Sequence, residues 1–235
     1  MFDNLLSSLK RVFWKPVLGT RGPSVVGLDF GASALKAVQA FKRGGKAVLE
    51  TYGAIALGPY GGSDVGKATK LSVEQAVSAL SDLFREANIS TRECALAIPF
   101  SASLVSLLEL PAVSEDELRT MVPIEARKYI PVPLAEVTLD WTALPEEEFI
   151  EPGTGEAGGE ERSTEAAASG TRRVGRMSVL VVAIHNETLA HYREVARIAS
   201  LNVHFVEVEI FSAIRAVLGQ SMGTAMIVDV GARTT

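Results

Sequence analysis

Two stretches that lie far apart in the sequence share one chemical pattern: an apolar run, an aspartate, one spacer, a glycine and then small or hydroxyl-bearing residues. The first stretch is residues 25–33 and the second is residues 226–234. An apolar strand would hold Asp29 or Asp229 at its end, and the glycine would let the backbone turn sharply and approach a ligand closely. One copy alone would be an ordinary strand-to-turn transition, but two copies are hard to explain in that way.

The chemistry of such a turn is phosphate binding. Its amide groups and hydroxyls would bind phosphate oxygens, and its carboxylate would hold Mg²⁺ directly or through water. Two turns that face each other would clamp a nucleotide triphosphate. We therefore expect Asp29 and Asp229 to lie close together at adjoining strand ends.

These residues resemble the phosphate-binding motifs of the actin, Hsp70 and sugar-kinase superfamily. Asp29-Phe30-Gly31-Ala32-Ser33 with Lys36 is similar to the first motif, and Asp229-Val230-Gly231-Ala232-Arg233-Thr234 is similar to the second. The resemblance implies ATP and Mg²⁺ as cofactors, with the metal held by Asp29 and Asp229. The nucleotide contacts that it implies are Asp29, Gly31, Ala32, Ser33, Lys36, Asp229, Gly231, Ala232 and Thr234. Relatives place a residue that orients the attacking water at about the position of Glu209, which is therefore the candidate catalytic residue.

The spacing of apolar residues predicts an α/β chain that could present these turns. We expect strands over residues 25–29, 35–41, 47–57, 94–99, 104–110, 137–144, 177–184, 204–208 and 225–230. Helices are expected over residues 72–87, 114–129, 186–200 and 209–218. The first two begin with Ser72 and Ser114, each followed three residues later by Gln or Glu, which is the spacing of a capping box. Gly44 and Gly45 predict a hairpin turn between the second and third strands.

Three further stretches resemble PilM-like proteins, namely residues 26–38, Leu110-Pro111 followed by Glu117-Leu118, and residues 125–131 leading to Asp140-Trp141. Residues 125–131 are the most specific, because PilM-like proteins carry a similar Glu-Ala…Tyr-Ile-Pro segment in their inserted subdomain. The resemblance implies an α/β fold with an actin-like (ribonuclease H-like) core domain, an inserted small α+β subdomain and a missing second lobe. The implied parts are a helix and linker over 1–22, a core over 23–100 plus 186–220, an insertion over 101–185, and the start of a truncated second lobe over 221–235.

Two segments of unusual composition flank or interrupt these parts. Residues 145–176 are rich in glutamate and glycine and poor in large apolar residues, so we expect a disordered acidic loop, with a regulatory arm as the alternative. Residues 1–15 carry apolar side chains at helical spacing, which predicts an amphipathic helix. We expect it to pack on its own domain, and a membrane-surface or partner-docking anchor is the alternative. Because the sequence ends within the second phosphate turn, we expect a fragment of a longer chain.

The composition and charge of the chain argue against several classes of protein. A net charge of −5 argues against a dedicated nucleic-acid binder, which usually shows a basic face. The single cysteine, Cys94, excludes a disulfide framework, and its apolar surroundings in the sequence indicate a small buried thiol. No stretch reaches the roughly 18 apolar residues that a membrane span needs, and the N-terminus lacks a signal-peptide pattern. We expect a soluble, cytoplasmic protein.

The resemblance implies a cytoplasmic ATP-binding scaffold for type IV pilus assembly at the inner face of the inner membrane. It would bind the N-terminal peptide of the inner-membrane protein PilN in a groove between the core and inserted subdomains, and would associate with the membrane through that partner. An FtsA-like cell-division scaffold or a type II secretion cytoplasmic domain is the alternative. A sugar-kinase-type phosphotransferase is a third reading, for which we find no substrate-cleft aspartate. Homo-oligomerisation and weak ATPase activity stay open.

Residues 61–67 have the glycine and lysine spacing of a P-loop. However, Ala68 stands where a hydroxyl must bind Mg²⁺, and the loop precedes the helix cap at Ser72 by several residues, so its amides would not crown a helix. We expect a surface loop there.

Overall fold

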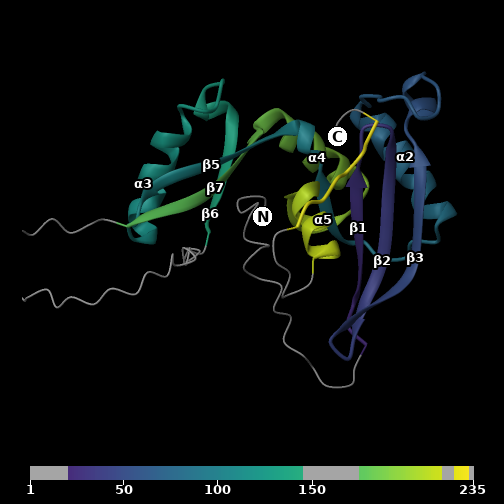
Figure 1. Cartoon of the computed structure of the whole chain (residues 1–235). Helices are drawn as coiled ribbons and strands as arrows, with labels where there is room; N and C mark the ends of the chain where they lie inside the picture. Colours follow the sequence, from purple (N-terminus) through teal and green to yellow (C-terminus); the bar gives the residue numbers. More distant parts are fainter. Residues whose placement is uncertain (1–20, 145–174, 219–224, 233–235) are drawn as a thin grey trace, which may run out of the picture.

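The computed structural model describes residues 21–144, 175–218 and 225–232, and its strands form two sheets (Figure 1). The larger sheet has the order β3-β2-β1-β4-β8. Its strands are β1 Ser24–Phe30, β2 Ala34–Arg43, β3 Lys46–Ala56, β4 Glu93–Ile98 and β8 Asn202–Val208. The first three strands form an antiparallel meander, whereas β4 runs parallel to both β1 and β8. The carboxyl ends of β1, β4 and β8 therefore meet at one edge, where open α/β sheets bind ligands.

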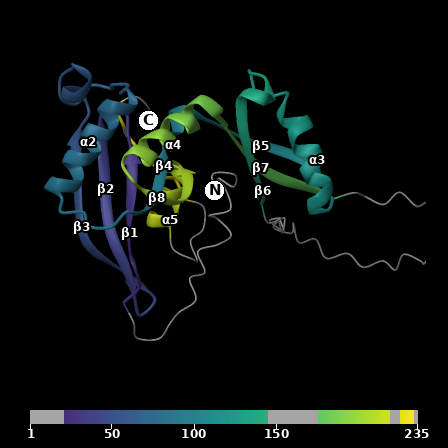
Figure 2. The same ribbon diagram turned by 180° about the vertical axis from the view of Figure 1, so that it is seen from behind.

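Helices cover this sheet on both faces. α2 (Val73–Glu86) and α4 (Asn186–Ile198) lie on one face and α5 (Glu209–Val217) lies on the other (Figures 1 and 2). The buried faces of the strands and helices form one apolar cluster that includes Val26, Leu28, Leu35, Leu80, Ile98 and Leu189. Burial of each such side chain stabilises the fold by about 1.5–3 kcal/mol, so this core holds the strand ends in fixed positions.

The smaller sheet is an insertion between β4 and α4. Its order is β5-β7-β6, with β5 at Ser103–Pro111, β6 at Val137–Ala143 and β7 at Arg176–His185, and all pairs are antiparallel. The chain enters it through the 3-10 helix η2 (Phe100–Ala102) and returns through β7 directly into α4. α3 (Glu115–Ala126) packs on it, and Leu118, Val122 and Val181 belong to a second apolar cluster. The division into independent domains stays a prediction.

The structure confirms the predicted helix starts and the predicted hairpin turn. Ser72 and Ser114 both form complete capping boxes, at the starts of α2 and α3. Gly44 and Gly45 have φ values of 56° and 82°, as a tight hairpin turn of the type I′ family requires. The helix expected to reach Tyr129 ends at Ala126 and continues as single turns.

One predicted element is wrong. Residues 225–230 form no strand, and residues 225–232 are exposed throughout. A strand requires a neighbour that satisfies its backbone groups, and none of the described strands pairs with this segment. The helix expected over residues 1–15, nearly all of the acidic segment and Thr234 lie outside the described residues. Within the described parts of the chain, no helix is both long and apolar enough to cross a membrane.

Candidate functional site

A cavity of about 290 Å³ opens at the edge where β1, β4 and β8 end. It is bounded by the turn after β1, the start of β2, the loop after β4, the start of α5 and the segment 225–232. The lining residues are Gly31, Ala32, Ser33, Ala34, Lys36, Pro99, Phe100, Ser101, Glu209, Ile210, Asp229, Val230, Gly231 and Ala232. The fold thus brings residues of both sequence motifs and Glu209 to one cavity, although nearly the whole chain separates the two motifs. Asp29 itself lies outside the lining and contacts it through Lys36.

The turn after β1 lines this cavity with Gly31, Ala32 and Ser33. The Gly31 amide donates to the Ala34 carbonyl (3.0 Å), which closes the turn, while the Ala32 and Ser33 carbonyls accept from the amides of Thr69 and Leu57 (2.9 Å each). Within the described chain, the Ala32 and Ser33 amides donate to no backbone carbonyl. A pair of such amides in a turn is a binding site for an anion.

Position 31 requires glycine because the Ala34 carbonyl oxygen lies close to it. A Cβ atom there would lie 2.9 Å from the Ala34 carbonyl oxygen, which is closer than such atoms come in real structures. Only a residue without a side chain fits the turn as it stands. The glycine of the first motif therefore has a geometric reason in this fold.

Carboxylates dominate the electrostatics of the cavity. Lys36 Nζ donates to Asp29 Oδ2 (3.0 Å), and this hydrogen bond raises the pKa of Lys36, with the charges of Asp29, Asp229 and Glu209 adding to it against the effect of burial. Burial raises the pKa of Glu209, and the charges of Asp29 and Asp229 raise it further. The Phe100 amide donates to Glu209 Oε1 (2.9 Å), which fixes this carboxylate and lowers its pKa in part. Three carboxylates against one lysine would repel a bare polyphosphate.

One of these carboxylates leaves a buried oxygen without a partner. Asp29 Oδ1 is buried and makes no hydrogen bond within the described residues. Such an oxygen costs stability unless a cation or a water satisfies it. Among those residues, no three His, Cys, Asp or Glu side chains are arranged to hold a metal ion by themselves. Asp229 lines the cavity and Asp29, although outside the lining, bonds to its Lys36, so this pair of carboxylates could hold Mg²⁺, which usually takes one or two carboxylates and completes its shell with water and phosphate.

Several neighbours of the cavity were missed by reasoning from sequence. Pro99, Phe100 and Ser101 line it because β4 ends beside β1, and the parallel pairing of two buried strands was the signal that could have located them. Tyr192 of α4 packs edge-on against Phe30 with ring centroids 5.2 Å apart. Burial raises the Tyr192 pKa, and the charges of Glu209 and Asp29 add to this shift, so the phenol is part of the site's surroundings.

The loop with P-loop spacing does not bind at this cavity through its lysine. Lys67 Nζ pairs with Asp64 (3.3 Å) and both side chains are exposed, while the next helix begins only at Val73. The prediction of a surface loop is confirmed. The 3-10 helix η1 (Gly58–Gly61) precedes the loop, and the Thr69 amide after it donates to the Ala32 carbonyl (2.9 Å), which gives this segment a structural role beside the turn after β1.

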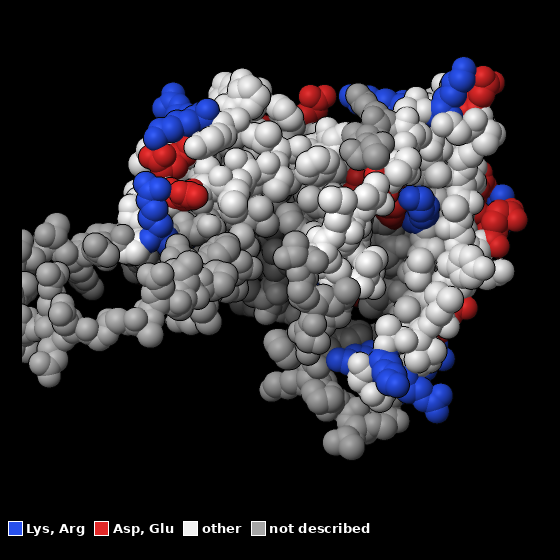
Figure 3. Space-filling view, viewed as in Figure 1, with Lys and Arg blue, Asp and Glu red and all other residues white. Residues whose placement is uncertain are grey.

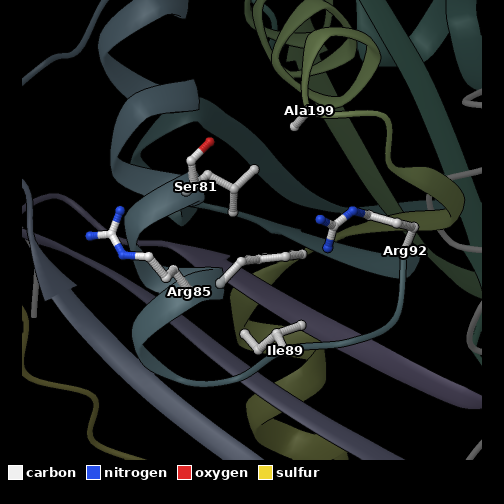
Figure 4. A pocket seen from close by; sticks show the side chains of 7 residues that line it. Ser81, Arg85, Ile89, Arg92 and Ala199 are labelled. Atoms are coloured by element: carbon white, nitrogen blue, oxygen red, sulfur yellow. The ribbon is translucent and has the colours of Figure 1, made fainter.

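A second cavity, of about 270 Å³, lies on the face of the sheet that α2 and α4 cover (Figure 4). Its lining is Leu80, Ser81, Phe84, Arg85, Ile89, Arg92 and Ala199. The Arg92 guanidinium stacks over the Phe84 ring at 4.9 Å, and Arg85 turns away to pair with Asp82 (2.8 Å). No carboxylate and none of the residues singled out in the sequence line it, so the candidate chemistry belongs to the cavity at the sheet edge.

A family model and several solved structures are similar to this chain. A family model described as type IV pilus assembly protein PilM matches residues 27–152, more than half of the chain. A solved structure of a PilM–PilN type IV pilus biogenesis complex is similar at 25% identity and a TM-score of 0.59, over 81% of this chain and 49% of that chain. The chain thus spans about half the length of that PilM. The cytoplasmic domain of EpsL, an inner-membrane component of the type II secretion system of Vibrio cholerae, matches at 11% identity and a TM-score of 0.48, over 81% of this chain and 59% of that chain. The expected α/β, actin-like fold with an inserted subdomain is confirmed.

Proposed function

The chain belongs to the PilM family of type IV pilus assembly proteins, and from that premise we propose that it binds ATP together with Mg²⁺ as a scaffold for pilus assembly. The observation that supports nucleotide binding is the cavity at the sheet edge. Ala32, Ser33, Lys36 and Asp229 line it, and Asp29, which lies outside the lining, accepts a hydrogen bond from Lys36 and keeps one oxygen without a partner among the described residues.

The charges of the groups around the cavity determine which of them would bind phosphate and which would bind the metal. The amides and Lys36 bind phosphate oxygens, whereas Asp29 and Asp229 hold the metal. Mg²⁺ supplies the positive charge that three carboxylates and a polyphosphate together lack. Glu209, held by the Phe100 amide, is positioned to orient a water molecule beside the terminal phosphate.

A binding titration with a fluorescent ATP analogue tests this proposal. The protein should bind the analogue only with Mg²⁺ present, and Asp29→Asn should weaken binding by about tenfold or more, because a metal contact is lost. Asp64→Asn is the matched control, since Asp64 is an exposed carboxylate in the loop with P-loop spacing. Binding that is equally strong without Mg²⁺, or equally weakened by both variants, would contradict the proposal. Glu209→Gln should keep nucleotide binding and lower any turnover.

We also propose that the chain contacts the N-terminal peptide of a PilN-like inner-membrane protein, and so is held at the inner face of the inner membrane. The similar solved structure is a complex of PilM with PilN. On this chain, a small apolar cavity between β5, β7 and the end of α3 includes Leu104, Leu108, Tyr129 and Ile130, and Leu104 and Tyr129 are partly exposed. The cavity holds only about 10 Å³ as it stands, so the exposed faces of Leu104 and Tyr129 are the apolar surface that a peptide side chain would cover.

A peptide titration tests the proposed binding of the PilN-like peptide separately from nucleotide binding. A labelled peptide from a PilN-like N-terminus should bind, and Tyr129→Ala should weaken it while the nucleotide titration stays unchanged. Ile124→Ala, at an exposed apolar residue earlier in α3, is the control. Absence of peptide binding to the wild-type protein would refute this part and leave the nucleotide proposal standing.

A further inference from the structure

The connection between β3 and α2 is long for a link between two packed elements. Residues 57–72 lie between Ala56 and Val73, and the 3-10 helix η1 is the only regular element among them. Loops longer than about 12–15 residues are uncommon in compact domains and usually serve a function. Residues 57–69, which we call the β3–α2 loop, include the stretch with P-loop spacing, and the proposed function gives this stretch no role.

The β3–α2 loop contacts the turn after β1 at two consecutive carbonyls. The Leu57 amide donates to the Ser33 carbonyl and the Thr69 amide to the Ala32 carbonyl (2.9 Å each). None of the described peptide bonds is cis, and a trans peptide is planar, so the Ala32 carbonyl and the Ser33 amide form one rigid unit and point in opposite directions. The bond from Thr69 therefore fixes the direction of the Ser33 amide, and Ser33 lines the cavity.

Contacts inside the loop hold Thr69 in place. Its hydroxyl shares a hydrogen bond with the Ser63 hydroxyl (2.6 Å) and donates to the Lys67 carbonyl (3.1 Å). Its methyl group packs against Gly61, where a Cβ atom would overlap Thr69 Cγ2. Glycine at position 61 thus allows the close approach on which the position of the Thr69 amide depends.

A second anchor ties the loop to α2. The Tyr60 hydroxyl donates to Asp82 Oδ2 (2.7 Å). Burial raises the pKa of Tyr60 to about 12, and the bond to Asp82 adds to this shift, so the hydroxyl remains a donor at physiological pH. The outer side of the loop carries the exposed pair of Asp64 and Lys67. Adjacent red and blue side chains appear in Figure 3 at the upper right, where Figure 1 shows the segment between β3 and α2. The loop is therefore held on its inner side by α2 and by the turn.

We propose that the β3–α2 loop is a positioning element of the nucleotide site, with Thr69 as its principal positioning residue. The loop holds the Ser33 amide in one direction before the ligand arrives, so a phosphate oxygen meets an oriented donor and binding does not have to order the turn. This inference rests on the proposed nucleotide binding. It adds residues that act from outside the site, because Gly61, Ser63 and Thr69 do not line the cavity.

A clash and its relief, both in the full chain, test the proposal. Gly61→Ala places a methyl group on Thr69 Cγ2, which displaces Thr69 and breaks its bond to the Ala32 carbonyl. Titration with a fluorescent ATP analogue and Mg²⁺ should then show binding about tenfold weaker or more, because a hydrogen bond to a charged group contributes at least this factor. Adding Thr69→Ser removes Cγ2 and keeps the hydroxyl, so the double variant should return to within about threefold of wild type.

Gly53→Ala is the matched control. Its Cβ would lie 2.8 Å from the Ala87 Cβ, between β3 and α2, so this variant disturbs packing without touching the turn. It should lower the free energy of unfolding in urea and leave the affinity for the analogue within about twofold of wild type. Amide hydrogen exchange without nucleotide gives a second readout. The Thr69 amide should be protected in wild type, unprotected in Gly61→Ala and protected again in the double variant.

Several outcomes would overturn the proposal. Gly61→Ala that binds the analogue as tightly as wild type would do so, as would a wild-type Thr69 amide that exchanges freely. A double variant that regains protection of Thr69 but not affinity would separate the loop from binding, and Gly53→Ala that loses as much affinity would reduce the effect to general destabilisation. Wild-type protein that binds no analogue contradicts the proposed function and the role of the loop together. Normal wild-type binding with unaffected loop variants refutes the role of the loop alone.

Discussion

Replacing Gly31 by alanine perturbs the proposed phosphate turn with the smallest possible change. The added methyl group would lie 2.9 Å from the Ala34 carbonyl oxygen, and both atoms are attached to backbone, so no flexible side chain can yield. Either the turn opens or the Gly31–Ala34 hydrogen bond lengthens. Forcing a methyl group into a packed site costs about 1–3 kcal/mol. The same shift moves the Ala32 and Ser33 amides, and each hydrogen bond to a charged phosphate contributes about 1.5–3 kcal/mol.

We therefore expect Gly31→Ala to lower the free energy of unfolding by about 1–3 kcal/mol and to weaken nucleotide binding at least about tenfold. Urea unfolding measures the first and titration of a fluorescent ATP analogue the second. Gly27→Ala is the matched control in the same strand, because its Cβ would meet only the Val38 carbonyl at 3.9 Å, an ordinary contact. That variant should be neutral or stabilised by up to about 1 kcal/mol, since alanine restricts the unfolded chain. Equal nucleotide affinity in Gly31→Ala and wild type, or equal losses in both variants, would refute the reasoning.

Three further predictions concern side chains around the core and the site. Burial raises the pKa of the Cys94 thiol to about 12, so Ellman's reagent at pH 8 should react only after the protein is unfolded in urea. Arg215→Met removes the guanidinium that donates to the buried Glu207 carboxylate, and it should lower the free energy of unfolding by about 3 kcal/mol. The double variant with Glu207→Leu should regain most of this free energy, because no buried charge is then left without a partner. Urea titrations measure both effects. The raised pKa of Glu209 means that its ionisation costs the folded state stability. Relative to Glu209→Gln, wild type should lose unfolding free energy as pH rises from below 4.5 through the raised value, and a flat difference across this range would contradict the assignment.

Sequence reasoning succeeded where the structure depends on neighbours along the chain. The capping boxes at Ser72 and Ser114 involve side chains and amides only three residues apart, so they form wherever a helix starts there. The hairpin at Gly44 and Gly45 is equally local, because two consecutive residues with positive φ determine the turn. These elements did not depend on knowledge of the tertiary fold.

It failed where the structure depends on a partner that is distant in sequence. Residues 225–230 have the apolar composition of a strand, but a strand exists only with a neighbour to bond, and the described sheets provide none for this segment. The support that Thr69 gives to Ala32 escaped for the same reason, since nothing in either residue type encodes the contact. The turn after β1 was recognisable because Gly31 and Asp29 form a local motif, and the close approach of Ala34 is the reason that this position takes glycine.

The two ends of the large sheet should act independently, because charge does not reach from one to the other. β1 runs from Ser24, which pairs with Phe41 at the hairpin end, to Phe30, which pairs with Leu35 at the cavity. Seven residues at about 3.3 Å each separate the ends by roughly 20 Å, more than twice the Debye length of about 8 Å at physiological ionic strength. Removing Arg43 and Lys46 should therefore leave nucleotide affinity within about twofold of wild type. A larger change would require the strands themselves to shift, and since the buried side chains of β1 and β2 pack in one core, such a shift would also appear as a loss of unfolding free energy.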